Sequence, residues 1–138
     1  VESRGLGDVY KRQIFNGHTY QKLFFNDLSQ AKHSVVISAT RLWLSKHSPI
    51  LDMLKELSAR GVEVFALVKN NTEKEERLKE TGIRTKVIDS LSMDAVIIDK
   101  SLIWYGSVNY LGYNTDENNA IRISDSKVAD QILEVLYT

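Results

Sequence analysis

Polar side chains that could hold a ligand or take part in chemistry gather around two short apolar runs in the second half of the chain. Ser92 and Asp94 precede the first run, Asp99 lies between the runs, and Ser107 and Asn109 follow the second. Serine hydroxyls and asparagine amides can donate hydrogen bonds to phosphate oxygens. A serine hydroxyl attacks phosphorus only when a neighbouring base activates it, and the sequence shows no base beside Ser92. The side-chain types therefore predict hydrogen bonds to a polar ligand more clearly than they predict nucleophilic catalysis.

The spacing of these residues predicts that they share one edge of a β-sheet. The apolar runs 95–98 and 102–105 are separated by a short polar turn, which is typical of a hairpin. Alternate residues of a strand point to the same face, so positions 92 and 94 lie side by side. Asn109 follows the end of the neighbouring strand. We therefore expect the polar residues before the first strand and after the second to meet at one rim.

Helix-like and strand-like segments alternate along the rest of the chain. Apolar residues at helical spacing predict a helix over about 17–32, and the β-branched run 34–39 predicts a buried strand. The pair Ser48-Pro49 is typical of a helix start. The remaining expected elements are helices from 49 to 61, from 72 to 82 and after 125, and strands over 62–68, 83–88 and 120–123. This order predicts an α/β fold with a mixed β-sheet flanked by helices.

The composition is that of one ordinary globular domain. The 138 residues are enough for a hydrophobic core, and 18 basic and 18 acidic residues give no general attraction to nucleic acid. The chain has no cysteine, which excludes disulfides and thiolate metal sites and fits a reducing cytosol. No apolar run approaches the roughly 20 residues of a membrane span. We therefore expect a cytoplasmic location, no membrane insertion, no metal and no cofactor.

The first thirteen residues stand apart from the rest. The stretch SRGLGDVYKRQ, Ser3–Gln13, resembles one translated reading frame of the adapter used in tagmentation sequencing libraries. We therefore interpret residues 1–13 as a non-native leader and expect the domain to occupy residues 14–138. On this interpretation the sequence is a metagenomic fragment and the natural gene continues upstream.

The stretch 94–109 reads DAVIIDKSLIWYGSVN and resembles the signature of the phospholipase D superfamily, H-x-K-x4-D-x6-G-S-x-N. The matching residues are Asp99, Gly106, Ser107 and Asn109. The sequence that follows is similar to phospholipase D-like domains attached to bacterial helicases and nucleases. The resemblance covers about residues 14–138 and implies a single phospholipase D-like lobe.

The resemblance implies a catalytic motif whose two reactive positions are changed. In the family a histidine attacks phosphorus, a second histidine from a paired copy protonates the leaving oxygen, and a lysine binds the phosphate. Ser92 and Asp94 stand at the histidine and lysine positions, and Asp99 keeps the acid of the motif. Unit charges 4 Å apart interact by roughly 4 kcal/mol at an effective dielectric constant of about 20, so an anion at Asp94 opposes phosphate binding. We therefore expect a degenerate copy that is inactive alone.

The phosphate-binding positions of the family are better preserved. They fall on Ser107 and Asn109 and, in the segment that follows, on Asn118, while Gly106 permits close approach of the backbone. The resemblance also implies a partner, which is a second phospholipase D-like lobe in tandem or in a homodimer. Nucleic acid is a further expected partner.

Three functions stay open at this point. The first is a non-catalytic lobe that binds a phosphodiester or scaffolds an intact lobe in a larger DNA- or RNA-processing protein. The second is an active phosphodiesterase or nuclease with a rearranged nucleophile, such as Ser92 or His47. The third is an interaction module without a phosphate site. The three differ in whether Ser107 and Asn109 face an open polar pocket or are packed shut.

Overall fold

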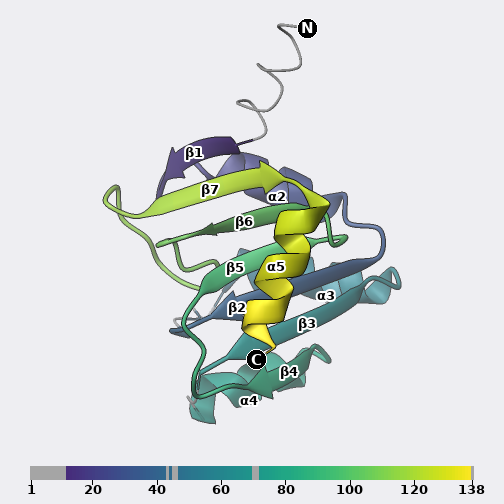
Figure 1. Cartoon of the computed structure of the whole chain (residues 1–138). Coiled ribbons are helices and arrows are strands. Elements are labelled where there is room, and N and C mark those ends of the chain that lie inside the picture. Colours follow the sequence, from purple (N-terminus) through teal and green to yellow (C-terminus); the bar gives the residue numbers. More distant parts are fainter. Residues whose placement is uncertain (1–11, 43, 45–46, 70–71, 138) are drawn as a thin grey trace, which may run out of the picture.

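The computed structural model describes residues 12–42, 44, 47–69 and 72–137 (Figure 1). These residues form a seven-stranded mixed sheet with the strand order β1-β7-β6-β5-β2-β3-β4. The strands are β1 (Arg12–Asn16), β2 (Ser34–Ala39), β3 (Glu63–Val68), β4 (Arg84–Val87), β5 (Asp94–Ile98), β6 (Leu102–Gly106) and β7 (Asn119–Ser124). The helices are α2 (Gln21–Ser29), α3 (Pro49–Ala59), α4 (Thr72–Glu80) and α5 (Ser126–Leu136). The predicted α/β fold with a mixed sheet is therefore confirmed.

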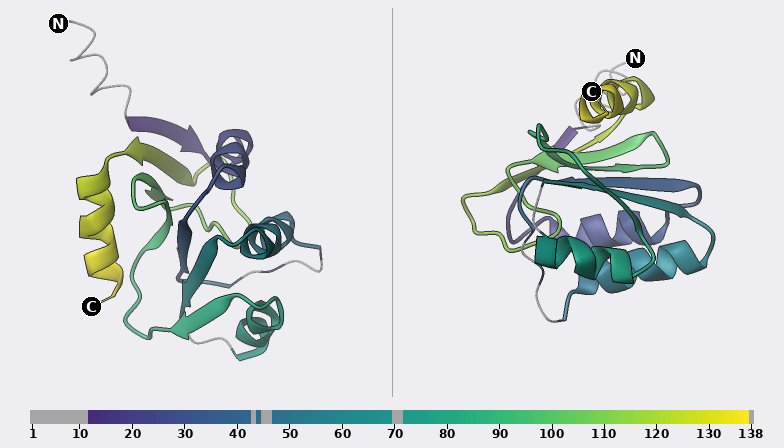
Figure 2. Two further views of the ribbon diagram at one scale, coloured as in Figure 1. Left: turned by 90° about the vertical axis from the view of Figure 1, so that its right-hand side faces the viewer. Right: turned by 90° about the horizontal axis from the view of Figure 1, so that it is seen from below.

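The described helices cover the two faces of the sheet unequally. Helices α2, α3 and α4 lie on one face and α5 lies on the other, as the two views in Figure 2 show. Strands β2, β3 and β4 are parallel, and helices α3 and α4 form the crossovers between them. Strands β5, β6, β7 and β1 run antiparallel to their neighbours. Because α5 is the single described helix on its face, the described residues place no helix on the parts of that face on either side of α5.

Capping residues fix where the helices begin. The predicted helix start at Ser48 is confirmed, because its side chain accepts a hydrogen bond from the backbone N–H of Leu51 at 3.4 Å and Pro49 begins α3. Asp125 caps α5 in the same way, since its Oδ1 accepts backbone N–H groups of the first turn at 2.9 and 3.3 Å. The capping residues therefore define where α3 and α5 begin, each on its own face of the sheet.

An aromatic cluster forms the core between α2 and the sheet. Trp104 is fully buried, and the rings of Phe24 and Tyr20 lie 5.5 and 6.3 Å from its ring centroid. The buried carboxylate of Asp27 accepts a hydrogen bond from Trp104 Nε1 at 2.9 Å. The same carboxylate accepts two from the Arg122 guanidinium, at 2.6 and 3.1 Å. The ion pair of Asp27 with Arg122 and the hydrogen bond from the Trp104 indole therefore connect α2 to β7 and β6.

Strand β1 is missing from the sequence-based prediction, which places a leader over residues 1–13 and a helix over about 17–32. In the structure Arg12 and Gln13 belong to β1, which pairs antiparallel with β7. The helix is shorter than predicted because Asn16 folds the chain into a turn, where its Oδ1 accepts the backbone N–H groups two and three residues further on. The sheet therefore begins upstream of the expected domain boundary. The rest of the expected leader lies outside the described residues.

Candidate functional site

The polar residues that flank the β5–β6 hairpin lie along one edge of the sheet. Asp94 begins β5 and pairs with Gly106, the last residue of β6. On the other side of β5, strand β2 ends next to the same edge and is followed by Thr40. We call this edge, formed by Thr40, Ser92, Asp94, Gly106 and Ser107, the rim. The structure thus brings the residues before β5 together with the residues after β6.

Thr40 holds the carboxylate of Asp94. The Thr40 backbone N–H donates to Oδ1 at 2.9 Å, and the Thr40 hydroxyl donates to Oδ2 at 3.0 Å. Both residues are half-buried. Because each oxygen has a donor, the carboxylate is oriented and its negative charge is fixed within the rim.

Ser92 is exposed at the rim. Within the described ranges no side chain forms a hydrogen bond with its hydroxyl, so none of them serves as a base for it. The next residue, Met93, is fixed by the buried Ser38, whose hydroxyl donates to the Met93 carbonyl at 2.7 Å and accepts from the Ala95 N–H at 2.9 Å. The start of β5 is therefore anchored, while the Ser92 side chain is not.

Gly106 and Ser107 shape the end of β6. Gly106 has a φ of 123°, and a Cβ at this position would lie 2.3 Å from the carbonyl oxygen of Asn119. Both facts require glycine. Ser107 is exposed, and its Oγ accepts the Asn119 N–H at 2.9 Å, which leaves the hydroxyl proton available to a ligand.

The Asn109 side chain is packed shut. Asn109 is 2% exposed; its Nδ2 donates to the Arg41 carbonyl at 2.7 Å and its Oδ1 accepts the Leu111 N–H at 2.9 Å. The Asn114 side chain bonds the Asn109 backbone at both its N–H and its carbonyl, at 2.7 and 2.9 Å. In this conformation Asn109 fixes the loops beside the rim and does not face an open pocket.

Asn118 lies beside Ser107 rather than beside Asn109. Its Nδ2 donates to the Ser107 carbonyl at 3.4 Å, and its Oδ1 accepts the Thr115 N–H at 2.8 Å. The amide therefore holds the turn before β7 against the end of β6.

Asp99 lies at the opposite end of β5 from the rim, roughly 16 Å away at the rise of an extended strand. Its carboxylate accepts the consecutive backbone N–H groups of Lys32, His33 and Ser34 at 3.1, 2.7 and 3.0 Å. Burial alone raises the pKa of Asp99, but these N–H groups and the nearby His33 outweigh it and hold the pKa below its usual value. Asp99 therefore anchors the connection between α2 and β2 and does not reach the rim.

The sequence match to a known family covers most of the chain. The family model described as "Cardiolipin synthase, PLD-like domain" matches residues 24–137. The chain belongs to this phospholipase D-like family. The predicted membership of the phospholipase D-like family is thereby confirmed.

Solved structures of phospholipase D-like proteins share the fold. Nuc, a phospholipase D family member from Salmonella typhimurium, superposes with a TM-score of 0.74 at 20% identity over 91% of both chains. NucT from Helicobacter pylori gives 0.69 at 17% identity over 91% of this chain and 92% of its own. TrmBL2, an archaeal chromatin protein, gives 0.67 at 15% identity over 91% of this chain and 50% of its own. At such identities the similarity shows the fold alone.

One curated protein also matches the phospholipase D-like chain. It is replicase polyprotein 1ab of lactate dehydrogenase elevating virus, 26% identical over 98 residues, which are 69% of this chain. The chain spans 3% of the length of that relative.

Tyr110 is a buried residue next to the rim of this phospholipase D-like domain. Burial raises the pKa of Tyr110, and the nearby Tyr20 and Asp94 raise it further. Its hydroxyl donates to the Tyr105 carbonyl at 2.8 Å. Tyr110 is therefore a neutral hydrogen-bond donor at physiological pH and not a base for the rim.

Two residues that hold the rim and the loop beside it were not predicted from the sequence, and one predicted candidate lies elsewhere. Thr40 and Asn114 carry no motif; the available signal was that Thr40 directly follows a strand that ends at the same sheet edge. His47 lines a polar cavity of about 320 Å³ between α3 and α4, together with Asp52 and Glu80, and no rim residue lines that cavity. The structure therefore does not bring His47 to the rim.

Other kinds of site were also sought in the described ranges. They hold no group of three or more His, Asp or Glu side chains that could bind a metal ion. None of the helices in these ranges is long and apolar enough to cross a membrane.

Proposed function

We propose that this chain is a non-catalytic phospholipase D-like lobe that scaffolds a second, intact lobe within a larger DNA- or RNA-processing protein. The observation that carries the proposal is the Asp94 carboxylate, which Thr40 holds in the rim at the position of the family's lysine. A cation that would attract the phosphate is replaced by an anion that repels it. The fixed hydrogen bonds make this anion part of the folded structure.

The nucleophile is lost together with the cation. Ser92 stands at the histidine position, and no base among the described residues contacts its hydroxyl. His47, the other candidate nucleophile, lines the cavity between α3 and α4. The arrangement therefore favours scaffolding over an active enzyme with a rearranged nucleophile.

Phosphate binding by this lobe alone is weak in this proposal. The Ser107 hydroxyl is exposed and has a free proton, but the Asn109 amide is occupied by Arg41 and Leu111. One neutral donor beside the charge of Asp94 does not hold a phosphodiester strongly.

An apolar strip beside the rim supports pairing with another lobe. Ile14, Ile121 and Tyr105 lie in one row across β1, β7 and β6, on the α5 face. Ile14 is 68% exposed, and the other two are half-buried. An exposed apolar strip next to a site is typical of a protein contact surface.

The proposed DNA- or RNA-processing context comes from a comparison with proteins that share the fold. TrmBL2 is an archaeal chromatin protein that shows a novel mode of DNA binding, and this chain covers 50% of its length. The DNA- or RNA-processing context is therefore a proposal by analogy with proteins that share the fold.

Hydrolysis of bis(p-nitrophenyl) phosphate and of a labelled single-stranded oligonucleotide tests the absence of catalysis. We expect no turnover above buffer for the chain, and no change for Ser92→Ala or Ser107→Ala. Turnover that disappears in Ser92→Ala would overturn the proposal. Sedimentation velocity of the wild type and Ile14→Asp tests whether the strip pairs with a lobe of this fold, with a second copy of the chain in place of the intact lobe. We expect association of the wild type that Ile14→Asp weakens.

A further inference from the structure

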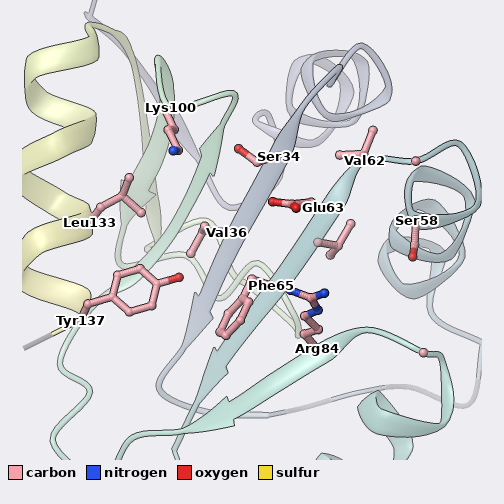
Figure 3. Close-up of a pocket in the computed structure, with 13 residues that line it drawn as sticks. Ser34, Val36, Ser58, Val62, Glu63, Phe65, Arg84, Lys100, Leu133 and Tyr137 are labelled. Carbon is pink, nitrogen blue, oxygen red and sulfur yellow. The ribbon is translucent and has the colours of Figure 1, made fainter.

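A second cavity lies at the sheet edge opposite the rim. It has a volume of about 500 Å³ and lies between α5 and the first halves of β2, β3 and β4 (Figure 3). Strand β2 runs from Ser34 at this cavity to Ala39 next to the rim, a path of roughly 17 Å in an extended strand. The cavity is therefore separate from the phospholipase D-like motif.

The cavity has an apolar floor and an apolar wall. In Figure 3 Leu133 and Tyr137 reach from α5 toward Val36 and Phe65 on the sheet. The rings of Phe65 and Tyr137 lie 6.2 Å apart between centroids at an interplanar angle of 64°. Tyr137 is 48% exposed, although its ring has this aromatic neighbour. Two tilted aromatic rings at the border of an open cavity can contact a flat ring on its edge and face.

The charges of the cavity favour an anion. Arg84 is the sheet neighbour of Phe65, so both side chains lie on the same face, and Figure 3 shows them side by side. Lys100 enters from the β5–β6 turn. Within the described ranges neither cation has a hydrogen bond or an ion pair. Glu63 also lines the cavity, so two cations and one carboxylate leave an excess of one positive charge.

We propose that this cavity is a binding site for a small aromatic anion, which places its ring against Phe65 and Tyr137 and its acid group on Arg84. A guanidinium holds a carboxylate or phosphate through two parallel N–H bonds, whereas an apolar ring alone would not require it. The volume of about 500 Å³ lies in the range of small-molecule pockets and accommodates a ligand of one or two fused rings. Lys100 at the other end of the cavity adds to the attraction for negative charge.

The test compares two ligands that differ in charge and share a ring. Naphthalene-2-carboxylate and its neutral amide are titrated into the full chain, with binding followed by ¹H NMR and by calorimetry. We expect the carboxylate to bind with a Kd on the order of 1 mM and the amide about tenfold more weakly. Equal affinities, or no carboxylate binding at 10 mM (about ten times the expected Kd), would overturn the proposal.

Three variants locate the site. Arg84→Gln removes most of the tenfold preference for the carboxylate and leaves amide binding unchanged. Tyr137→Ala weakens both ligands, and Tyr137→Phe restores both because it keeps the ring. Lys86→Gln is the matched control, since Lys86 is an exposed cation on the same strand and face that does not line the cavity. An Arg84→Gln protein that binds the carboxylate like the wild type, or a loss in Lys86→Gln equal to that in Arg84→Gln, would contradict the assignment.

Discussion

Thr40 donates one hydrogen bond to each carboxylate oxygen of Asp94 and thereby joins the end of β2 to the start of β5. Asp94, which our mapping of the family motif assigns to the lysine position, therefore has a structural contact of its own. Its carboxylate is not left unpaired in the rim. The contact connects the two strands whose ends form this edge of the sheet.

The coupling between Thr40 and Asp94 can be measured directly. Thr40→Val removes the hydroxyl donor while it keeps the backbone N–H, and Asp94→Ala removes both acceptors. We expect each single change to lower the free energy of unfolding by about 1–2 kcal/mol, because hydrogen bonds to a charged group are lost. Urea unfolding of both single variants and the double variant gives a coupling energy of about 1 kcal/mol. Fully additive effects would show that the hydrogen bond between the Thr40 hydroxyl and the Asp94 carboxylate contributes nothing to stability.

Asp99 makes the stability depend on pH. Its folded-state pKa lies below its usual value, so the stabilisation is complete above the unfolded-state pKa of about 3.9 and is lost as the pH falls through the folded-state pKa. We expect Asp99→Asn to lower the free energy of unfolding at pH 7 by about 1–2 kcal/mol and to flatten its fall as the pH drops below about 5.

The control for Asp99 is Asp130→Asn. The Asp130 carboxylate is exposed on α5 and forms no hydrogen bond with the described residues. Its removal leaves the pH profile of stability unchanged. The same acid-induced loss in Asp99→Asn as in the wild type would mean that other carboxylates cause it.

Gly106 is required by its neighbours as well as by its backbone. A Cβ at Gly106 meets the Asn119 carbonyl at 2.3 Å, whereas a Cβ at Gly82, which also has a positive φ, meets no atom within 4 Å. We expect Gly82→Ala to cost about 1–2 kcal/mol from backbone conformation alone. Gly106→Ala costs at least about 2 kcal/mol more, since the ends of β6 and β7 must separate. Thermal and urea unfolding of the two variants compare them, and equal losses would remove the argument from packing.

We expect the buried ion pair of Asp27 and Arg122 to contribute more to stability than the exposed pair of His18 and Asp116. Asp27 also accepts from Trp104, so Asp27→Asn leaves a largely buried guanidinium without a counter-charge. We expect a loss of about 2–3 kcal/mol, part of which is recovered when Arg122→Met is added. Asp116→Asn, which disrupts the exposed pair, leaves the free energy of unfolding within error. Chemical unfolding of the wild type and these three variants tests this, and an equal effect of the two single changes at Asp27 and Asp116 would contradict it.

Local signals explain which parts of the fold the sequence predicts. The hairpin and the start of α3 depend on residues close together in the chain, such as Ser48 and Leu51, and both were predicted. Strand β1 was missed because its pairing with β7 joins Phe15 to Ala120 across the whole chain, and five residues of mixed polarity give no local pattern.

In the site, too, residue spacing predicts some features, and tertiary contacts determine the others. Motif spacing places Asp94 beside Gly106, as the structure shows. The contacts that determine the roles of these residues come from segments distant in the sequence. Thr40 donates hydrogen bonds to Asp94, and the Arg41 carbonyl accepts a hydrogen bond from the Asn109 side chain. A motif fixes which residue types share an edge, but it does not show which of them are already engaged by the surrounding loops.

The mapping of the family motif onto positions 92 and 94 makes the most direct prediction. Ser92→His with Asp94→Lys replaces an anion in the rim by a cation and adds an imidazole. At an effective dielectric constant of about 20 the exchange of repulsion for attraction is worth several kcal/mol. We therefore expect inorganic phosphate to bind the double variant at millimolar concentrations and to leave the wild type unbound, as measured by ³¹P NMR and calorimetry. The phosphate affinity of Asp94→Asn, which removes the repulsion without adding a cation, is expected to lie between those of the wild type and the double variant.

The double variant also loses the carboxylate oxygens that accept hydrogen bonds from Thr40. Its free energy of unfolding therefore falls by about 1–2 kcal/mol, and unfolding is measured alongside binding. Adding Ser107→Ala reduces the gained affinity, because the exposed Ser107 hydroxyl is the neutral donor next to the new cation. A folded double variant with no gain in phosphate affinity would show that positions 92 and 94 do not face the phosphate site.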